Sequence, residues 1–459
     1  MEFDTKIAKL NERSAAGRKR VAVVGSGISG LSAAWHLHDD HDVTLLEAND
    51  YLGGHTHTVN ITVGDITFPV DTGFIVFNPQ NYPNLTALFE LLGVETMKTD
   101  MSFSASIDDG NFEYAGGDGG GLFAQPANLF KVRFWSMLTG IIKFYRNAQR
   151  YERDGAFNSL NLRELLKLEG YSKAFIEDHL APMGAAIWSS DSINILDYPA
   201  HSFLKFFNNH GLTQLANRPV WRSVINGSCS YVKKIEMELR GKASVYLNCP
   251  VSSVVPNGDK VDVCWYGQQE TFDHVILACH SDQARRLLQG AEKHREILKS
   301  IRYSENKVVL HSDVSLMPKR RKAWASWNYI GSSASNAPRP AVSYWMNQLQ
   351  ALPVETPVIV TLNPNRPIDP AKIYGEFEYD HPIFDHAAQA AKTKVWAQQG
   401  LDNIWLAGAY LGDGFHEDGI QSGLAVAELI SGRRRPWQAA DQNKRIGLPD
   451  LLPLEEPVK

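Results

Sequence analysis

A glycine pattern near the start of the chain limits its fold more than any other feature. Residues 21–24 are apolar and mostly β-branched, which is typical of a buried strand. The pattern G-x-G-x-x-G follows directly, made by Gly25, Gly27 and Gly30. The first glycine permits the tight turn, the second lets backbone approach a pyrophosphate, and the third lets a helix pack closely on the strand. The sequence therefore predicts a dinucleotide-binding strand–turn–helix unit.

A second predicted strand supplies the acidic partner of this motif. Residues 42–46 form an apolar stretch that ends in Glu47, about 20 residues beyond the second glycine. A carboxylate there can accept hydrogen bonds from ribose hydroxyls, while Ile28 and Ser29 open the helix whose N-terminus attracts phosphate. The alternative is a glycine-rich turn of another α/β protein, and the matching strand and acid argue against it.

The residues after Glu47 resemble a flavoprotein superfamily. Ala48 is followed by a short loop and then by Gly53-Gly54-His55. This order resembles the FAD-binding fingerprint of the amine oxidase and phytoene desaturase superfamily, which usually has arginine where this chain has His55. Either His55 replaces that arginine as a hydrogen-bond donor, or it is an ordinary loop histidine.

Later segments resemble the same superfamily. A short strand ends in Asp-Thr-Gly at 71–73, and the stretch 404–408 ends in Ala-Gly before a glycine-rich turn and an apolar helix. In the family these segments lie along the flavin, where a helix N-terminus stabilises the negative charge of the reduced ring. The resemblance implies FAD contacts with Thr72, Gly73, Val251, Gly408, Ala409, His416, Gly419 and Ile420.

The cysteines bear on how the flavin is held. Family members that attach flavin through cysteine do so from the C-terminal region, and all four cysteines of this chain come earlier: Cys229, Cys249, Cys264 and Cys279. We therefore expect non-covalent FAD. No C-x-x-C pair is present, so neither a metal site nor a redox pair is expected, and a reducing compartment is favoured.

Length and charge narrow the class of protein. The chain has 459 residues, enough for two domains, and its net charge of -5 gives no support for a nucleic acid partner. It contains no apolar run of about 18 residues, and its first 20 residues are polar and charged. We expect a cytoplasmic protein and leave open a peripheral membrane contact and a homodimer.

The resemblance and the order of predicted elements imply an α/β fold with two domains. We expect a Rossmann-like FAD-binding domain and an α+β substrate domain, each built from separated stretches of the chain. The expected ranges are a flexible lead-in over 1–18, an FAD domain over 19–100, 222–290 and 396–432, a substrate domain over 101–221 and 291–395, and a C-terminal arm over 433–459.

Two segments can each be interpreted either as a membrane contact or as an ordinary core or surface segment. Residues 122–150 are aromatic, basic and helical in period, and predict either a membrane-leaning helix or a core helix with a wet basic face. Residues 319–324, Lys-Arg-Arg-Lys-Ala-Trp, either contact anionic lipid or form a solvated turn.

Candidate catalytic residues come from the resemblance. Amine oxidases often hold a water at the flavin with a strand lysine, and Lys307 is at a matching place, with a strand-end lysine in solvent as the alternative. Phe415 occupies the position of a tyrosine that flanks the substrate nitrogen in those enzymes. His416 beside it is a candidate proton acceptor or a donor to the flavin.

The closing motif and the aromatic stretches favour an apolar substrate. Within the superfamily the chain looks most like bacterial flavoproteins associated with cyclopropane or methyl-branched fatty acid modification. This similarity implies oxidation or desaturation of a fatty acyl chain, such as that of a membrane phospholipid. The alternatives are an amine or amino acid oxidase, and a lipid-escort protein that shares the fold without catalysis.

Overall fold

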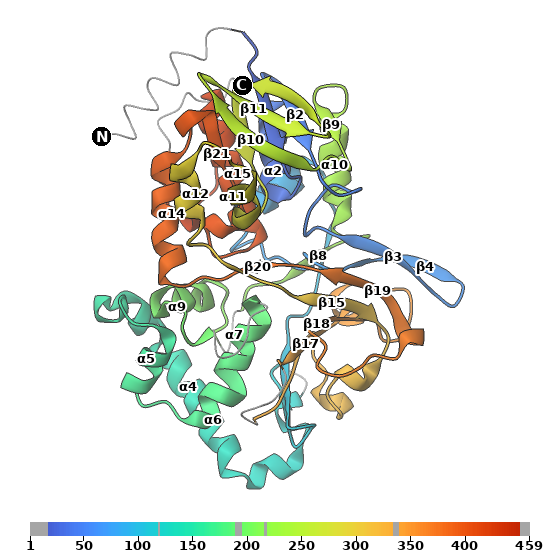
Figure 1. Cartoon of the computed structure of the whole chain (residues 1–459). Helices are drawn as coiled ribbons and strands as arrows, with labels where there is room; N and C mark the ends of the chain where they lie inside the picture. Colours follow the sequence, from blue (N-terminus) through green and yellow to red (C-terminus); the bar gives the residue numbers. More distant parts are fainter. Residues whose placement is uncertain (1–16, 118–119, 189–194, 215–217, 334–338, 450–459) are drawn as a thin grey trace.

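The computed structural model describes residues 17–117, 120–188, 195–214, 218–333 and 339–449. It has two parts, one above the other in Figure 1, and the fold is the mixed α/β architecture expected from the sequence. The lead-in expected over 1–18 lies outside the described residues except for 17 and 18. No helix within the described ranges is both long and apolar enough to cross a membrane.

The upper part is built on a parallel sheet. Its strand order is β21-β13-β1-β2-β9, and every neighbouring pair is parallel. The strands are β1 (Arg20–Val24), β2 (Asp42–Leu46), β9 (Ser244–Tyr246), β13 (His274–Leu277) and β21 (Ile404–Leu406). Because helices cover both faces of such a sheet, the strands read as continuous apolar runs, and residues 21–23 are fully buried.

Other elements complete the upper part. An antiparallel sheet is formed by β10 (Val251–Asn257), β11 (Lys260–Trp265) and β12 (Gln268–Phe272). The helices are α2 (Ile28–Leu37), α3 (Pro83–Leu91), α10 (Cys229–Leu239), α11 (Ser281–Leu287), α12 (Glu292–Leu298), α14 (His386–Gln398) and α15 (His416–Ser431).

The lower part combines a seven-stranded sheet with a group of helices. The order is β19-β15-β18-β17-β16-β6-β7, and all pairs are antiparallel except β16 with β6. The strands are β6 (Phe103–Ile107), β7 (Phe112–Ala115), β15 (Lys307–His311), β16 (Trp327–Gly331), β17 (Ala341–Trp345), β18 (Ile359–Leu362) and β19 (Ile373–Glu378). The helices are α4 (Val132–Arg153), α5 (Leu162–Leu168), α6 (Lys173–Phe175), α7 (Ala181–Trp188), α9 (Ala200–Asn209) and α13 (Met346–Leu349).

Short two-stranded sheets connect the two parts. They pair β3 (Thr58–Val63) with β4 (Ile66–Asp71), β5 (Thr96–Lys98) with β8 (Arg222–Val224), and β14 (Tyr303–Ser304) with β20 (His381–Pro382). The β3–β4 hairpin projects to the side in Figure 1. In Figure 1 the strands β8 and β20 lie at the level between the two parts.

Three segments pack differently from the expected domain ranges. Helices α12 and α14 were expected in the substrate domain, yet Leu298, Ala388 and Val395 belong to the core of the parallel sheet. The β3–β4 hairpin was expected in the FAD domain, yet Phe68 and Val70 pack with the substrate-domain strands. The two sheets themselves lie inside their expected ranges, and the exact domain boundaries stay a prediction.

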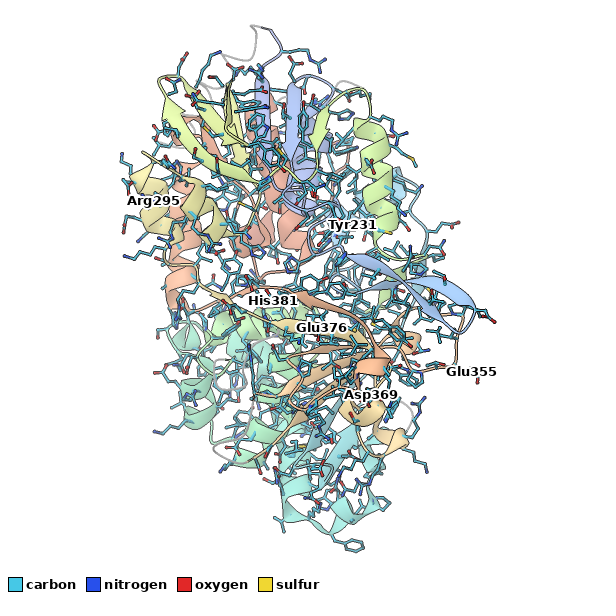
Figure 2. The ribbon with its side chains drawn as sticks, turned by 45° about the vertical axis from the view of Figure 1, so that its right-hand side comes forward. Tyr231, Arg295, Glu355, Asp369, Glu376 and His381 are labelled. Carbon is cyan, nitrogen blue, oxygen red and sulfur yellow. The ribbon has the colours of Figure 1, made fainter. Side chains whose placement is uncertain are left out.

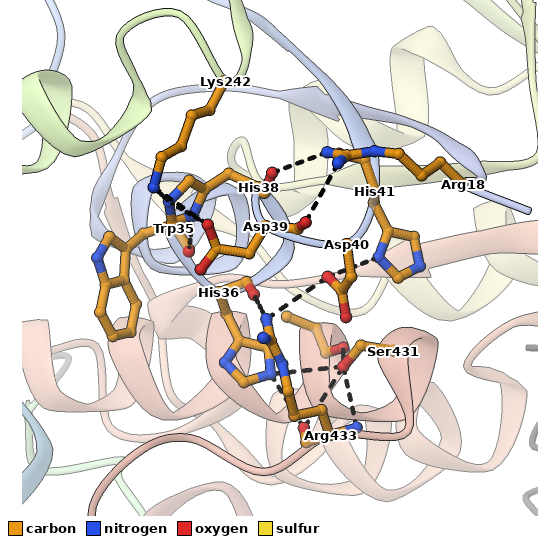
Figure 3. Close-up of polar contacts among 11 residues, drawn as sticks. Arg18, Trp35, His36, His38, Asp39, Asp40, His41, Lys242, Ser431 and Arg433 are labelled. Carbon is orange, nitrogen blue, oxygen red and sulfur yellow. Dashed lines mark hydrogen bonds and ion pairs between the residues drawn. The ribbon is translucent and has the colours of Figure 1, made fainter. Parts of the chain in front are cut away.

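The C-terminal end of α2 is fixed by cations from distant segments, as Figure 3 shows. Arg18 donates to the carbonyls of His38 and His41 at 3.1 and 2.9 Å, and Arg433 donates to the carbonyl of His36 at 2.6 Å. Cations at a helix C-terminus satisfy its free carbonyls and its partial negative charge. The end of α2 that faces away from the glycine turn is therefore held in place.

The C-terminal arm is held against the FAD domain over its described residues 433–449, which include a short 3-10 helix at Lys444–Ile446. Arg435 is fully buried and pairs with Glu428 of α15 at 2.7 Å. Its guanidinium also donates to Asn84 and Asn443, at 2.8 and 2.9 Å. A buried charge pair is stable only when its remaining hydrogen bonds are made, and here they are. The arm therefore binds α15 to α3.

Two glycines of the turn provide a matched pair of substitutions. A Cβ at Gly30 would lie 1.9 Å from the carbonyl oxygen of Gly25, whereas a Cβ at Gly27 would meet no atom within 4 Å. Gly30→Ala should lower the free energy of unfolding by about 3 kcal/mol, at the upper end of overpacking costs. Gly27→Ala should leave it within about 0.5 kcal/mol, as for an uncrowded site, and should lower FAD binding. Denaturant unfolding of the flavin-free protein and flavin titration measure both effects, and equal destabilisation by the two variants would contradict the packing argument.

Candidate active site

A cavity of about 290 Å³ lies between the two parts. Its walls come from the glycine turn, the Gly-Gly loop, the 72–76 segment, the closing motif and the aromatic helices of the substrate domain. Many sequence-predicted residues line it: Gly27, Ile28, Ser29, Gly53, His55, Thr72, Gly73, Gly408, Ala409, Phe415 and His416. The following predicted residues do not: Gly25, Gly30, Glu47, Ala48, Gly54, Val251, Lys307, Gly419 and Ile420.

The N-terminus of α2 is suited to bind a pyrophosphate. Its N-cap is Gly27, which provides no side-chain cap, and the first turn contains no acidic residue. The backbone N–H groups of this turn are therefore free to donate to an anion, aided by the helix dipole. The Gly-Gly loop lies alongside, because Gly53 forms a bridge with Gly27 and the Gly53 N–H donates to the Ser26 carbonyl at 3.1 Å.

Glu47 lies at the end of β2, beside the glycine turn. Its carboxylate accepts hydrogen bonds from Ser26 N and Oγ, at 2.8 and 2.5 Å, and from Asn49 N at 2.9 Å. The parallel register pairs Val24 with Leu46, so the turn and the acid necessarily end at the same edge of the sheet. Glu47 is buried whereas Ala48 is exposed, and the assignment of both to the adenosine half stays a prediction.

The 71–73 segment fixes one wall of the cavity. Thr72 Oγ1 lies 2.7 Å from the Tyr379 hydroxyl, and the Cβ of any residue at Gly73 would lie 2.1 Å from the His55 carbonyl oxygen. Asp71 is fully buried and accepts from Ser228 and Gln350, at 2.9 Å each. Burial raises the pKa of Asp71 to about 6. Asp71 therefore holds the segment in place rather than facing the cavity.

His416 opens helix α15 and lines the cavity. Its ring stacks on Phe74 at 3.7 Å, and its Nε2 lies 2.9 Å from Thr56 Oγ1 and 2.8 Å from the Tyr231 hydroxyl. Burial lowers the pKa of His416 to about 3, so the imidazole is neutral near pH 7. Sequence reasoning missed Thr56 and Tyr231, and no local pattern marks them. The role of His416 as a proton acceptor or donor stays a prediction.

Two acidic residues follow His416 but point away from the cavity. Glu417 accepts hydrogen bonds from Asn84 N and Leu85 N, at 3.1 Å each, and so caps helix α3. Asp418 accepts from Phe415 N at 2.7 Å and pairs with Arg445 at 2.6 Å. The positive end of the α15 dipole therefore faces the cavity without an opposing carboxylate from these two residues.

His55 belongs to a histidine cluster that the sequence did not reveal. Its ring centroid lies 5.5 Å from those of His280 and His381 and 5.2 Å from that of Tyr379. Figure 2 shows His381 between the two parts of the molecule. Burial lowers the pKa of His55 to about 3, and its Nε2 is buried with no hydrogen-bond partner among the described residues. An unpaired polar atom in a cavity wall fits a donor or acceptor for a bound cofactor.

Phe415 contributes to an aromatic wall on the substrate side. Its ring stacks on Phe206 at 4.7 Å and lies 6.0 Å from His210 and 6.3 Å from Trp188. Burial lowers the pKa of His210 to about 3, so this wall carries no charge from it near pH 7. The aromatic character of this stretch was visible in the sequence, but which rings face Phe415 was not.

The structure corrects the interpretation of Lys307 as a cavity residue. Its side chain is 57% exposed and pairs with Glu376 at 2.9 Å. Glu376 lies on β19, the edge strand of the substrate-domain sheet, and is labelled in Figure 2. Lys307 opens β15, so it extends past the end of the sheet toward solvent. The alternative of a solvent-exposed strand-end lysine is the one that the structure shows.

The fold and the cavity define a class of protein with a Rossmann-like dinucleotide domain and a separate substrate domain. A sequence model of the family described as flavin containing amine oxidoreductase matches residues 28–348. The chain belongs to this family, and FAD is its cofactor. The open glycine turn, the uncapped helix end and the unpaired His55 Nε2 are consistent with such a cofactor.

Individual relatives share part of the sequence or the fold. Flavin-containing amine oxidase A of Sus scrofa is 28% identical over 273 residues, which is 56% of this chain and 48% of that protein. The chain thus spans about half the length of this curated relative. A CLA-producing fatty acid isomerase from P. acnes has a TM-score of 0.62 at 17% identity, covering 90% of this chain and 98% of that one. Cyclohexylamine oxidase from Brevibacterium oxydans IH-35A has a TM-score of 0.63 at 15% identity, covering 90% and 99%.

The position of Glu47 predicts a specific loss of flavin affinity. Glu47→Gln keeps the shape of the side chain but removes its charge, which weakens its hydrogen bonds to donors. Since hydrogen bonds to charged groups contribute about 1.5–3 kcal/mol, the Kd for FAD should rise at least about tenfold. Asp42→Asn at the exposed start of the same strand is the control and should leave the Kd unchanged. Flavin fluorescence titration measures both, and an unchanged Kd in Glu47→Gln would contradict the ribose assignment.

The cysteines predict that the flavin is released by acid. Cys279 lines the cavity, and burial raises its pKa to about 12, so its thiol is protonated and a poor nucleophile near pH 7. Precipitation of the holoprotein with acid should therefore leave the yellow colour in the supernatant. A yellow pellet would contradict non-covalent binding, and mass spectrometry of its peptides would identify the attachment residue.

Proposed function

We propose that the protein is an FAD-dependent oxidoreductase that oxidises an apolar fatty acyl chain. The observation that carries the proposal is the uncharged substrate side of the cavity. Asp380 is the only carboxylate among the described lining residues, and these include no lysine or arginine. Asp380 lies on the side of the histidine cluster, where its backbone contacts His55.

An acyl chain fits such a wall better than a cationic amine. Each methylene removed from water contributes about 0.8 kcal/mol, so a long chain binds without an ion pair. A cationic amine needs a carboxylate or an open aromatic cage when it is desolvated. A cage that holds a cation between two ring faces needs a gap of roughly 7 Å, the sum of two contacts of about 3.5 Å. The ring centroids of Phe415 and Phe206 are 4.7 Å apart, so these two rings leave no room for a group between them.

The proposed reaction forms a carbon–carbon double bond. When bound, FAD accepts a hydride from carbon, and a proton leaves the adjacent carbon. The residues of this chain bind the acyl chain against the aromatic wall, orient its reacting carbons and exclude water. His416 is neutral and lies within hydrogen-bond distance of two hydroxyl groups, which supports a role for it in accepting or relaying that proton.

Three observations bear on the choice among the candidate functions. The sequence similarity to flavin-containing amine oxidase A of Sus scrofa supports an amine or amino acid oxidase as the second candidate. The fold neighbour that is a fatty acid isomerase supports the compatibility of this fold with an acyl substrate. A non-catalytic lipid-escort protein is disfavoured, because the glycine turn, Glu47 and the closing motif are all intact.

Anaerobic reduction of the flavin tests the proposal. The holoprotein is mixed with amines, amino acids, and unsaturated or methyl-branched acyl lipids, and the absorbance of oxidised flavin is followed. We expect bleaching by an acyl lipid, followed by identification of a desaturated product by mass spectrometry. Bleaching by an amine alone would promote the amine oxidase candidate, and protein purified without flavin that cannot be loaded with FAD would promote the escort candidate.

A wall variant links the reaction to the cavity. Phe206→Gln places an amide against Phe415 and should raise the lipid concentration for half-reduction about tenfold, since burying a Phe side chain contributes about 1.5–3 kcal/mol. FAD content and melting temperature verify that the variant is folded. Tyr266→Gln on the exposed surface of the FAD domain is the control and should behave as the parent protein.

A further inference from the structure

The end of the molecule furthest from the FAD domain carries exposed apolar side chains. They lie in the segment between β7 and the start of α4, at the lower end of Figure 1. We call them the apolar tip: Phe123, Leu129, Phe130, Val132 and Trp135. Phe130 is 92% exposed and Val132 is 85% exposed, so both protrude rather than lie in a groove. Several large apolar side chains that are exposed close together indicate a binding surface.

The backbone under the apolar tip is firmly held. Asn128 donates from Nδ2 to the Glu113 carbonyl at 3.0 Å, and Gln125 Oε1 accepts from Glu113 N at 2.8 Å. Trp135 Nε1 donates to the Leu129 carbonyl at 2.9 Å. These bonds tie the segment to strand β7 and to the first turn of α4. The exposed apolar side chains are thus carried on a fixed scaffold.

Cations lie beside the apolar tip. The segment 319–324 passes close to residue 121, two positions before Phe123, since a Cβ at Gly121 would lie 3.3 Å from the Lys322 carbonyl oxygen. Lys319 and Arg320 are paired with Asp109 and Glu113 at 2.6 and 2.9 Å. Arg321 instead lies over the Trp324 ring at 3.7 Å, and Lys322 is exposed with no ion pair among the described residues.

We propose that the apolar tip docks on an anionic lipid bilayer. Its protruding side chains enter the boundary between headgroups and acyl chains, where aromatic rings are favoured, and Arg321 and Lys322 contact the lipid phosphates. The chain as a whole has a net charge of -5, so this attraction is local to the surface formed by the tip and its flanking cations.

A bilayer explains the surface better than a second copy of the chain. A stable dimer buries roughly 800 Å² on each partner, and two protruding tips meet over little area. Where Arg321 and Lys322 lie near the two-fold axis, a symmetric contact would also bring them toward the same residues of the other copy. The proposal rests on the surface alone and holds whichever substrate the cavity takes.

Vesicle binding by the full-length holoprotein tests the docking. The probes are phosphatidylcholine vesicles with and without phosphatidylglycerol, separated from free protein by flotation. We expect binding to the anionic vesicles that weakens with salt. Phe130→Ser combined with Val132→Ser should lower the partition coefficient at least about tenfold, and Lys322→Glu should lower it several-fold on anionic vesicles only. All three substitutions are at exposed positions, so flavin content and melting temperature should be unchanged in both variants.

A surface control separates the apolar tip from general stickiness. Met237 on α10 is 64% exposed and lies on the FAD domain, so Met237→Ser should bind vesicles like the parent. Three outcomes would overturn the proposal: no binding of the parent to anionic vesicles, an equal loss in Met237→Ser, or self-association of the parent that Phe130→Ser abolishes without any vesicle binding.

Discussion

The close contact between helices α2 and α15 is the constraint on which the site depends. A Cβ at Gly423 would lie 2.2 Å from the Ser29 carbonyl oxygen, and one at Gly419 would lie 2.6 Å from Ile28 Cγ2. Only glycine permits this approach, because any side chain would separate the two backbones. As a result the N-termini of both helices meet at one cavity. Two positive dipole ends thereby face the cavity, where they would stabilise the negative charge of a bound FAD at its pyrophosphate and its reduced ring.

Buried charge elsewhere keeps those two helix ends effective. Glu417 and Asp418 lie in the first turn of α15 and are fully buried. Had their carboxylates faced the cavity, they would have opposed a reduced flavin. Glu417 instead caps α3, and Asp418 pairs with Arg445 of the C-terminal arm. The arm therefore affects the cofactor site electrostatically, although none of its described residues 433–449 lines the cavity.

The sequence predicted the parts of the site whose residues are neighbours in the chain. The strand, the glycine turn and α2 are contiguous, and parallel pairing of β1 with β2 brings Glu47 to Ser26 without further information. The histidine cluster could not be predicted this way. His55, His280 and His381 come from a loop, the N-cap of α11 and a short two-stranded sheet, and no local periodicity relates them. The same limit applies to Tyr231, which reaches His416 only after the domains are assembled.

The sequence allowed two interpretations each for Lys307 and for helix α4, and only tertiary contacts decide between them. Strand alternation places Lys307 on the same face as the buried Val309, yet its position at the strand end and the nearby Glu376 hold it in solvent. Helix α4 has apolar residues on more than one face, so its period alone does not identify the buried face. In its 22 residues, Phe134, Met137 and Phe144 enter the core, while Val132 and Trp135 remain exposed. The buried residues show that α4 is a core helix, and the membrane-leaning interpretation stays a proposal for the exposed residues at its start.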